Sequence, residues 1–423
     1  MWVKSLAVRN VVSVVSGILF LISVVALLAS HLDARPAQSI MTLMVWVLPV
    51  IYFFRYSYEF SVGQKCLLLF SLILFLSSVA GSLFVDEFWE GNSFRAYWLY
   101  LLPLGLVPII ENVPIKKDWF LNILILCALC SFVVVFKDIS SGSIRGARHG
   151  LPIPYGTISL STSLLCLIFA FDKSVHPIKK AFLLMSFILA SVGVVWSQTR
   201  GAWVYLIIWI LVVSFVWFKY EKSIQKKSIV TFIALMITGL FVLLPPGKFV
   251  QKRISDAVYE LEMYAHDSSA KTSSGQRLDL WFVSFEAFCE NPVFGGGTVG
   301  FLEKRNELME SGHINIYSTL QHSHNDLLWF AATRGAVGVL ALLLVYIGLF
   351  LYYLRCLKHP VTSIYGAAGL TIVGGAIVYG ITDIYMSVKI TIGYFFVINS
   401  LIIGLIEKDK LENDKRYKLC EVT

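Results

Sequence analysis

Long uninterrupted apolar runs constrain this chain more than any other feature. A helix needs about 20 residues to cross a hydrocarbon core about 30 Å thick. About twelve runs of that length lie near residues 10–30, 39–55, 64–85, 95–112, 118–136, 152–171, 180–199, 201–218, 228–245, 326–354, 362–383 and 388–406. Only 15% of the residues are charged, against about 25% in soluble domains. The sequence therefore predicts an all-α polytopic membrane protein.

The distribution of charge predicts the orientation of these spans. The net charge is +8, but Lys and Arg are scattered between the apolar runs instead of clustering on a soluble module, which disfavours a nucleic-acid partner. With both ends in the cytoplasm, more than half of the 35 basic residues fall in short inner segments, as the positive-inside rule requires. The segment 246–325 is then expected to face outward.

One integral membrane domain is expected, in three parts. Residues 1–245 would form nine spans, 246–325 a mostly helical outer loop, and 326–423 three more spans with a short tail. Within the loop, "SSGQRLDLWFVSFEAFCENP" predicts an amphipathic helix that stops at Asn291-Pro292. Its predicted apolar face consists of Leu278, Trp281, Phe282, Phe285 and Phe288.

Two arginines are candidates for binding phosphate. Arg200 lies where two apolar spans meet with almost nothing between them, and its position at the outer surface opposes the charge bias. Arg277 lies near the start of the loop helix, where the helix dipole favours anions. Guanidinium groups bind phosphate in a bidentate manner. Snorkelling of Arg200 to lipid phosphates and a solvated Arg277 are the structural alternatives.

Two histidines, His322 and His324, precede the tenth span. A histidine at the water–lipid boundary can act as a general base near neutral pH. The alternatives are a hydrogen-bonded interface histidine or a metal pair, but the sequence has neither HExxH nor a third ligand nearby. It also lacks an Asp-x-Asp motif and a P-loop. No metal, nucleotide or other cofactor is expected.

Other charges lie close to the spans. Arg145 and Arg148, in "SIRGARHGLPIP", are expected on the outer side. Asp383 and Lys389, in "GITDIYMSVKIT", are interpreted as a structural ion pair.

The region around His324 resembles a known signature. His324-Asn325, nine further residues, then Gly335 and Gly338 is similar to the H-[N/S/Q]-x9-G-x-x-G motif of the bacterial O-antigen ligase family. About twelve spans, a large loop between the ninth and tenth, a Thr-Arg at the outer end of an earlier span and an arginine in the loop extend the resemblance to nearly the whole chain.

The resemblance implies a fold of the GT-C type and a glycosyl transfer at the periplasmic face of the bacterial inner membrane. The family moves a glycan from undecaprenyl diphosphate to a sugar hydroxyl of lipid A–core, without ATP or metal. Arg200 and Arg277 would bind the donor diphosphate, and His324 would act on the acceptor hydroxyl, giving inversion. The resemblance also suggests a set of supporting or substrate-binding residues: His322, Asn325, Arg145, Arg148, Arg334, Gly335 and Gly338.

Three alternatives stay open. An O-antigen polymerase would use the same donor but extend another lipid-linked glycan. A protein O-oligosaccharyltransferase of the same superfamily is usually longer, with a soluble C-terminal region, whereas this chain ends soon after its last predicted span. A transporter of lipid-linked glycans would be expected to carry charges near mid-bilayer, and here they gather at the outer face. The oligomeric state is left open.

Overall fold

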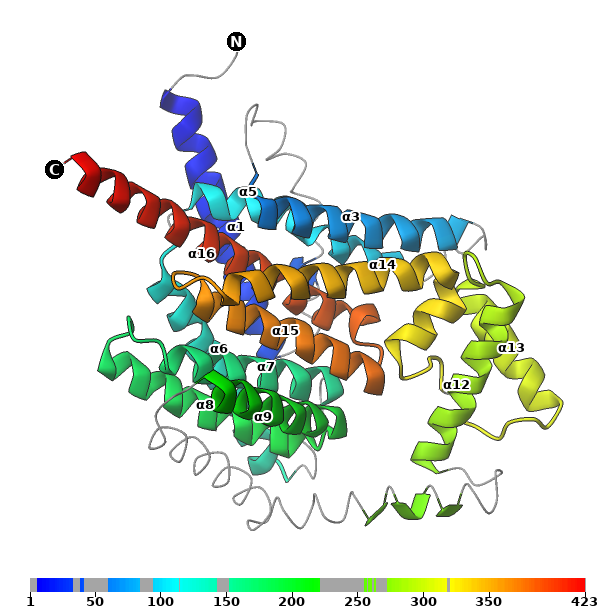
Figure 1. The fold of residues 1–423 in the computed structure, drawn as a ribbon. Helices are drawn as coiled ribbons and strands as arrows, with labels where there is room; N and C mark the ends of the chain where they lie inside the picture. Colours follow the sequence, from blue (N-terminus) through cyan, green and yellow to red (C-terminus); the bar gives the residue numbers. More distant parts are fainter. Residues whose placement is uncertain are drawn as a thin grey trace.

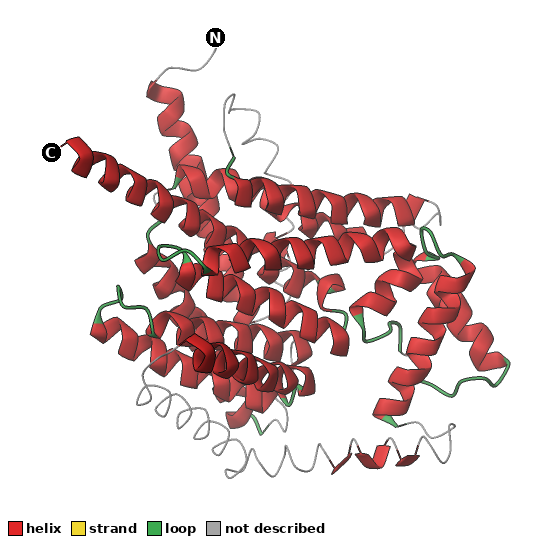
Figure 2. Ribbon diagram, in the orientation of Figure 1, coloured by secondary structure: helices red, strands yellow, loops and turns green. Residues whose placement is uncertain are grey.

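The protein is helical throughout the described part of the chain. The computed structural model describes residues 6–32, 39–41, 60–83, 94–113, 115–142, 152–220, 255–256, 258–260, 262–263, 272–317 and 320–422. None of these residues lies in a strand, and Figure 2 shows helices joined by short loops. The all-α polytopic class predicted from the sequence is confirmed.

Most of the predicted spans coincide with helices. The elements, in chain order, are α1 (Leu6–Leu32), α3 (Val62–Leu83), α4 (Phe94–Tyr97), the 3-10 turn η1 (Trp98–Leu101), α5 (Leu102–Asn112), α6 (Lys117–Ser140), α7 (Pro152–Ala170), α8 (Pro177–Ser197), α9 (Arg200–Tyr220), α12 (Ser273–Glu290), α13 (Gly297–Glu310), α14 (Asp326–Leu357), α15 (Ser363–Thr382), the 3-10 turn η2 (Tyr385–Ser387) and α16 (Lys389–Val422). Seven of them, α3, α6, α7, α8, α14, α15 and α16, are long and apolar enough to cross a membrane.

Three shorter apolar helical segments, Ser16–His31, Trp98–Ile110 and Arg200–Val213, match three further predicted spans. The predicted span 228–245 lies outside the described residues, as does most of 39–55. The part of the chain that the structure describes therefore accounts for ten of the twelve predicted spans, seven long and three short.

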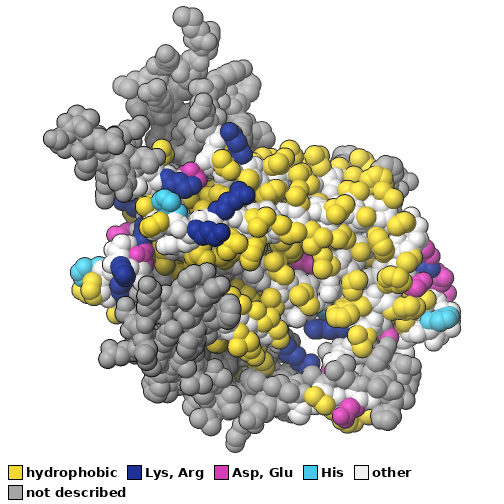
Figure 3. Space-filling view, viewed as in Figure 1, with side chains coloured by type: hydrophobic (Ala, Val, Ile, Leu, Met, Phe, Trp, Pro, Cys, Tyr) yellow, Lys and Arg dark blue, Asp and Glu magenta, His cyan; other side chains and the backbone are white. Residues whose placement is uncertain are grey.

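The spans pack side by side, and α12 and α13 lie at one end of the bundle, opposite the last turns of α16 (Figure 1). Hydrophobic side chains cover much of the described surface between the two ends (Figure 3). On α14 this surface is a stripe at helical spacing, formed by the exposed residues Leu340, Leu344, Ile347 and Leu351. An apolar outer surface of this kind is expected to face lipid.

Helix α14 is broken at Gly335. This residue has φ 62° and ψ −161°, a conformation that is essentially restricted to glycine. The segment that follows α12 supplies the hydrogen bonds lost at the break: Gly296 N–H donates to the Ala332 carbonyl at 2.9 Å, and Ala336 N–H donates to the Pro292 carbonyl at 2.8 Å. Because unpaired backbone groups are costly inside a membrane protein, these bonds dock the segment firmly onto α14.

Arg334, beside the break, is almost fully buried, with 1% of its surface exposed. Its guanidinium lies 3.9 Å from the centre of the Phe330 ring and 4.5 Å from that of Tyr97. It also donates to the Tyr100 hydroxyl at 3.2 Å. A Cβ at Gly338 would overlap the Arg334 side chain, so this glycine makes room for the arginine.

The loop helix α12 has the predicted end but a different buried face. It stops at Glu290 and is capped at Asn291, as predicted. Leu280, Val283 and Ala287 are buried, whereas Phe282 and Phe285 are exposed. The aromatic face predicted from the sequence is therefore not the face that packs on the bundle. Helix α13, which follows the glycine-rich stretch, was not predicted.

The break in α14 can be tested by replacing Gly335 with alanine. We expect Gly335→Ala to lower stability by about 1–3 kcal/mol for the backbone conformation alone, and by more because the new Cβ would overlap the Val293 carbonyl. Thermal unfolding of the purified protein in detergent would measure the loss. Gly300→Ala, where a Cβ meets nothing within 4 Å, is the matched control. Equal melting temperatures for the two variants would contradict the conclusion that the break in α14 requires glycine at position 335.

Candidate active site

The loop before α14 is fixed by short-range hydrogen bonds. The buried Ser323 hydroxyl donates to the Asn325 carbonyl at 2.7 Å. The Asn325 Oδ1 accepts from Leu328 N–H at 3.1 Å and so caps the helix. The Nδ2 of the same side chain donates to the Ile381 carbonyl at 3.3 Å, which ties the start of α14 to the end of α15. Asn325 thus determines where the loop lies.

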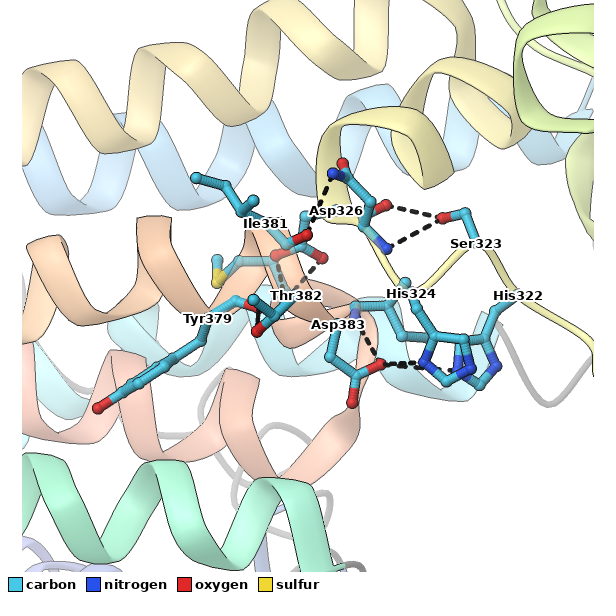
Figure 4. A network of polar contacts seen from close by, with 11 residues as sticks. His322, Ser323, His324, Asp326, Tyr379, Ile381, Thr382 and Asp383 are labelled. Carbon is cyan, nitrogen blue, oxygen red and sulfur yellow. Dashed lines mark hydrogen bonds and ion pairs between the residues drawn. The ribbon is translucent and has the colours of Figure 1, made fainter. Parts of the chain in front are cut away.

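His324 adopts a left-handed backbone conformation with φ 51°. This conformation is uncommon for a residue other than glycine and often marks a functional site. The loop directs both imidazoles toward Asp383 (Figure 4). The Nδ1 of His324 lies 3.0 Å from Asp383 Oδ1, and the Nε2 of His322 lies 3.6 Å from the same oxygen. The ring centres of the two histidines are 4.2 Å apart.

Asp383 caps the end of α15 and is buried. Burial by itself would raise the pKa of this carboxyl, but the hydrogen bonds from His322 and His324 outweigh it and hold the pKa well below its usual range. Asp383 is therefore ionised. From the sequence, Asp383 was interpreted as the partner of Lys389 in a structural pair. That interpretation does not include the role seen here, in which the carboxylate orients the two histidines.

The geometry selects the tautomer of His324. An ionised carboxylate can only accept hydrogen bonds, so the proton lies on Nδ1 and the lone pair of Nε2 is available. Burial lowers the pKa of His324, and this effect outweighs the hydrogen bond from its ring to Asp383, which raises it. The imidazole is thus neutral near pH 7. A neutral ring, oriented by a carboxylate and with one free nitrogen, is equipped to act as a general base.

The same three side chains are the ones that could hold a metal ion among the described residues: ligand atoms of His322, His324 and Asp383 lie within 4.8 Å of one another. The third potential ligand comes from α15, so it was not visible from local spacing. An ion on Nδ1 of His324 would require the ring proton on Nε2, which would remove the free lone pair. The metal-bound and hydrogen-bonded arrangements therefore differ in chemistry.

Asp326, which was not a predicted site residue, anchors the other side of the loop. It is almost fully buried, and both of its carboxylate oxygens accept from Met386 N–H at 3.0 Å. The Tyr346 hydroxyl lies 3.4 Å from Oδ2. A carboxylate in the first turn of an otherwise apolar span was the available signal, because such groups are rare without a function or a partner.

Arg200 begins α9 and lies next to the end of α15. A Cβ on the neighbouring Gly201 would overlap the Thr382 hydroxyl, so the two helices approach closely beside Asp383. The Arg200 guanidinium is 3.6 Å from the carboxylate of Glu260 and is partly exposed. Arg200 thus lies at an end of its helix, beside the end of α15, and the outward orientation expected for it stays a prediction.

Arg277 lies one turn into α12 and connects the other groups electrostatically. Burial lowers the pKa of Arg277; the neighbouring Asp383 raises it, Arg200 lowers it and Glu260 raises it. Arg277 in turn lowers the pKa of His324. The contacts agree with this, because Glu260 lies 3.6 Å from the Arg200 guanidinium and accepts from Ser274 in the first turn of α12. Arg200 and the start of α12 therefore lie at the same end of the bundle as His324.

The remaining candidates fall into two groups. Arg145 and Arg148 lie outside the described residues. Arg334, Gly335 and Gly338 lie at or near the break in α14, where the arginine is enclosed by aromatic rings. Their structural contacts account for these residue types without a bound substrate.

These elements define a multi-pass helical membrane protein with a histidine–carboxylate cluster and two arginines at one end of its bundle. Residues 185–343 match the O-antigen ligase family, and this region includes Arg200, Arg277 and His324. The match covers less than half of the chain and confirms the resemblance over this region. Members of the superfamily are glycosyltransferase-like ligases and polymerases.

Two relatives show how far the similarity extends. An uncharacterized protein of Haemophilus influenzae is 29% identical over 264 residues, covering 61% of this chain and 65% of that protein. An O-antigen ligase of Escherichia coli K12 is 27% identical over 137 residues, covering 31% of this chain and 32% of that protein. The chain therefore spans less than two thirds of the length of either relative.

The protonation state of His324 can be measured directly. We expect its imidazole resonances in labelled protein to titrate with a midpoint below 6.5, the ordinary value, because burial lowers the pKa. Asp383→Asn should move the midpoint lower still, since the carboxylate raises it. His324→Gln assigns the signal by removing it. A midpoint above 6.5, or an upward shift in the Asp383 variant, would contradict this description of the pair.

Proposed function

We propose that this protein transfers a glycan from undecaprenyl diphosphate to a sugar hydroxyl of lipid A–core at the periplasmic face of the bacterial inner membrane. The observation that supports it most is His324, whose Nδ1 faces Asp383 so that its lone pair lies on Nε2, at the same end of the bundle as two arginines. The match to the O-antigen ligase family covers these three residues.

The arginines would neutralise the leaving group. Departure of diphosphate from the anomeric carbon places negative charge on its bridging oxygen, and preorganised cations stabilise that charge. Arg200 and Arg277 supply two guanidinium groups in a partly buried setting. In this role they replace the divalent ion that many nucleotide-sugar transferases use, so the proposal requires no metal or nucleotide.

The histidine would act on the acceptor. Its Nε2 takes the proton of the acceptor hydroxyl as that oxygen attacks the anomeric carbon. The bond from this carbon to the diphosphate oxygen breaks, and the electron pair leaves with the diphosphate. His324 ends the step as an imidazolium stabilised by Asp383. One displacement of this kind inverts the anomeric centre.

Transfer with purified full-length protein tests the proposal. Wild type, undecaprenyl-diphosphate glycan, lipid A–core and excess EDTA should yield glycosylated core. We expect His324→Ala to lose about 10²–10⁴-fold in rate, as for a general base, and Arg200→Ala or Arg277→Ala about 10²–10³-fold. His313→Ala, an exposed loop histidine, and Arg355→Ala, at the far end of α14, are matched controls and should keep wild-type rates.

The products distinguish the alternatives. Longer lipid-linked glycan without modified core would make the protein a polymerase. Loss of activity on adding EDTA would instead support an ion on His322, His324 and Asp383. Wild-type rates in His324→Ala would show that His324 is not the general base. The absence of any glycosidic product from folded protein would favour a transporter.

A further inference from the structure

Glu260 lies among the groups that would bind the donor diphosphate. Its Oε2 accepts from the backbone N–H of Ser274 at 3.1 Å and from the Ser274 hydroxyl at 2.6 Å. Its Oε1 is 3.6 Å from the Arg200 guanidinium, and its charge acts on Arg277. One carboxylate thus interacts with both arginines and with the first turn of α12.

This set of partners is the one expected around a phosphate. The first turn of a helix offers free N–H groups and a positive dipole end, and anions bind there together with arginines. The Thr272 cap satisfies Gly275 N–H at 3.0 Å, while Ser274 N–H and the hydroxyl beside it are taken by Glu260. The carboxylate therefore uses the same donors that a phosphate would use.

The contact with Arg200 is weaker than a direct hydrogen bond. The N–O distance of 3.6 Å exceeds the usual 2.7–2.9 Å of a charge-assisted hydrogen bond, and the Glu260 side chain is 18% exposed. A diphosphate carries more charge than a carboxylate and several acceptor oxygens, so it can satisfy both guanidinium groups better than Glu260 does.

We propose that Glu260 is an internal competitor for the diphosphate subsite, which the donor displaces on binding and which helps to expel undecaprenyl diphosphate after transfer. This inference rests on the proposed function, because it takes Arg200 and Arg277 as the diphosphate ligands. The leaving diphosphate carries one more ionisable oxygen than the donor and would otherwise bind the arginines more tightly than the substrate does. A returning carboxylate weakens the binding of donor and product alike, and so it limits how tightly the product is held after transfer.

Glu260→Gln separates this role from a purely structural one. Glutamine keeps the shape of the side chain and an oxygen that can accept from Ser274, but it removes the negative charge. We expect inorganic pyrophosphate to bind the full-length variant in nanodiscs about ten-fold more tightly, equivalent to about 1.4 kcal/mol, as measured by calorimetry at fixed ionic strength. Undecaprenyl diphosphate should also inhibit the variant at about ten-fold lower concentration.

Glu262→Gln is the matched control, since it removes one charge from an exposed position two residues away and should leave pyrophosphate affinity unchanged. If Glu260 only positions Arg200, the Gln variant will bind pyrophosphate more weakly and raise the KM for donor, which would overturn the inference. An unchanged affinity would overturn it as well.

Arg200→Ala and Arg277→Ala distinguish failure of the inference from failure of the proposed function. In both the wild-type and Glu260→Gln backgrounds, these substitutions should abolish pyrophosphate binding. If binding persists without the arginines, the donor site itself is wrong. If it requires the arginines but does not tighten in Glu260→Gln, only the role of Glu260 is wrong.

Discussion

Backbone hydrogen bonds across the break in α14 join the two halves of the candidate site. The segment that follows α12 satisfies the carbonyl of Ala332 and the N–H of Ala336, which the interrupted helix cannot pair within itself. Helix α12 carries Arg277, and His324 precedes Asn325, the residue that caps the start of α14. Because unpaired backbone groups are so costly in this environment, the docking fixes the loop helix, and with it an arginine, relative to the histidine.

Two carboxylates at this end of the bundle compensate different groups. Asp383 orients the histidines and would stabilise an imidazolium, whereas Glu260 interacts with the arginines and the first turn of α12. Neither acid belongs to the helix or loop that carries its partners, so neither pairing follows from local sequence. Asp383 occupies the Nδ1 side of His324 and so leaves the lone pair on Nε2, while Glu260 partly compensates the charge of the guanidinium groups.

The sequence predicted the helical class and the ten spans that the structure describes, because apolar length is a local property of the chain. It could not predict the Asp383–His324 contact, which joins residues 59 positions apart. The prediction of the buried face of α12 was wrong for a physical reason. Periodicity identifies an apolar face but does not say whether that face packs against the rest of the protein. Phe282 and Phe285 lie on the side away from the bundle. Nothing in the sequence distinguishes Glu260 from the neighbouring acids.

The spacing of the family motif has a physical meaning in this structure. Asn325 caps α14, and Gly335 breaks it, so the nine residues between them are one rigid helical segment. Ten steps along a helix advance about 15 Å, and one residue more or fewer would rotate the break by about 100° relative to the cap. Either change would misdirect the backbone groups that bind the segment after α12. The motif therefore sets the distance and rotation between the histidine loop and the point where the loop helix docks, which explains why glycines belong to the same pattern as the histidine.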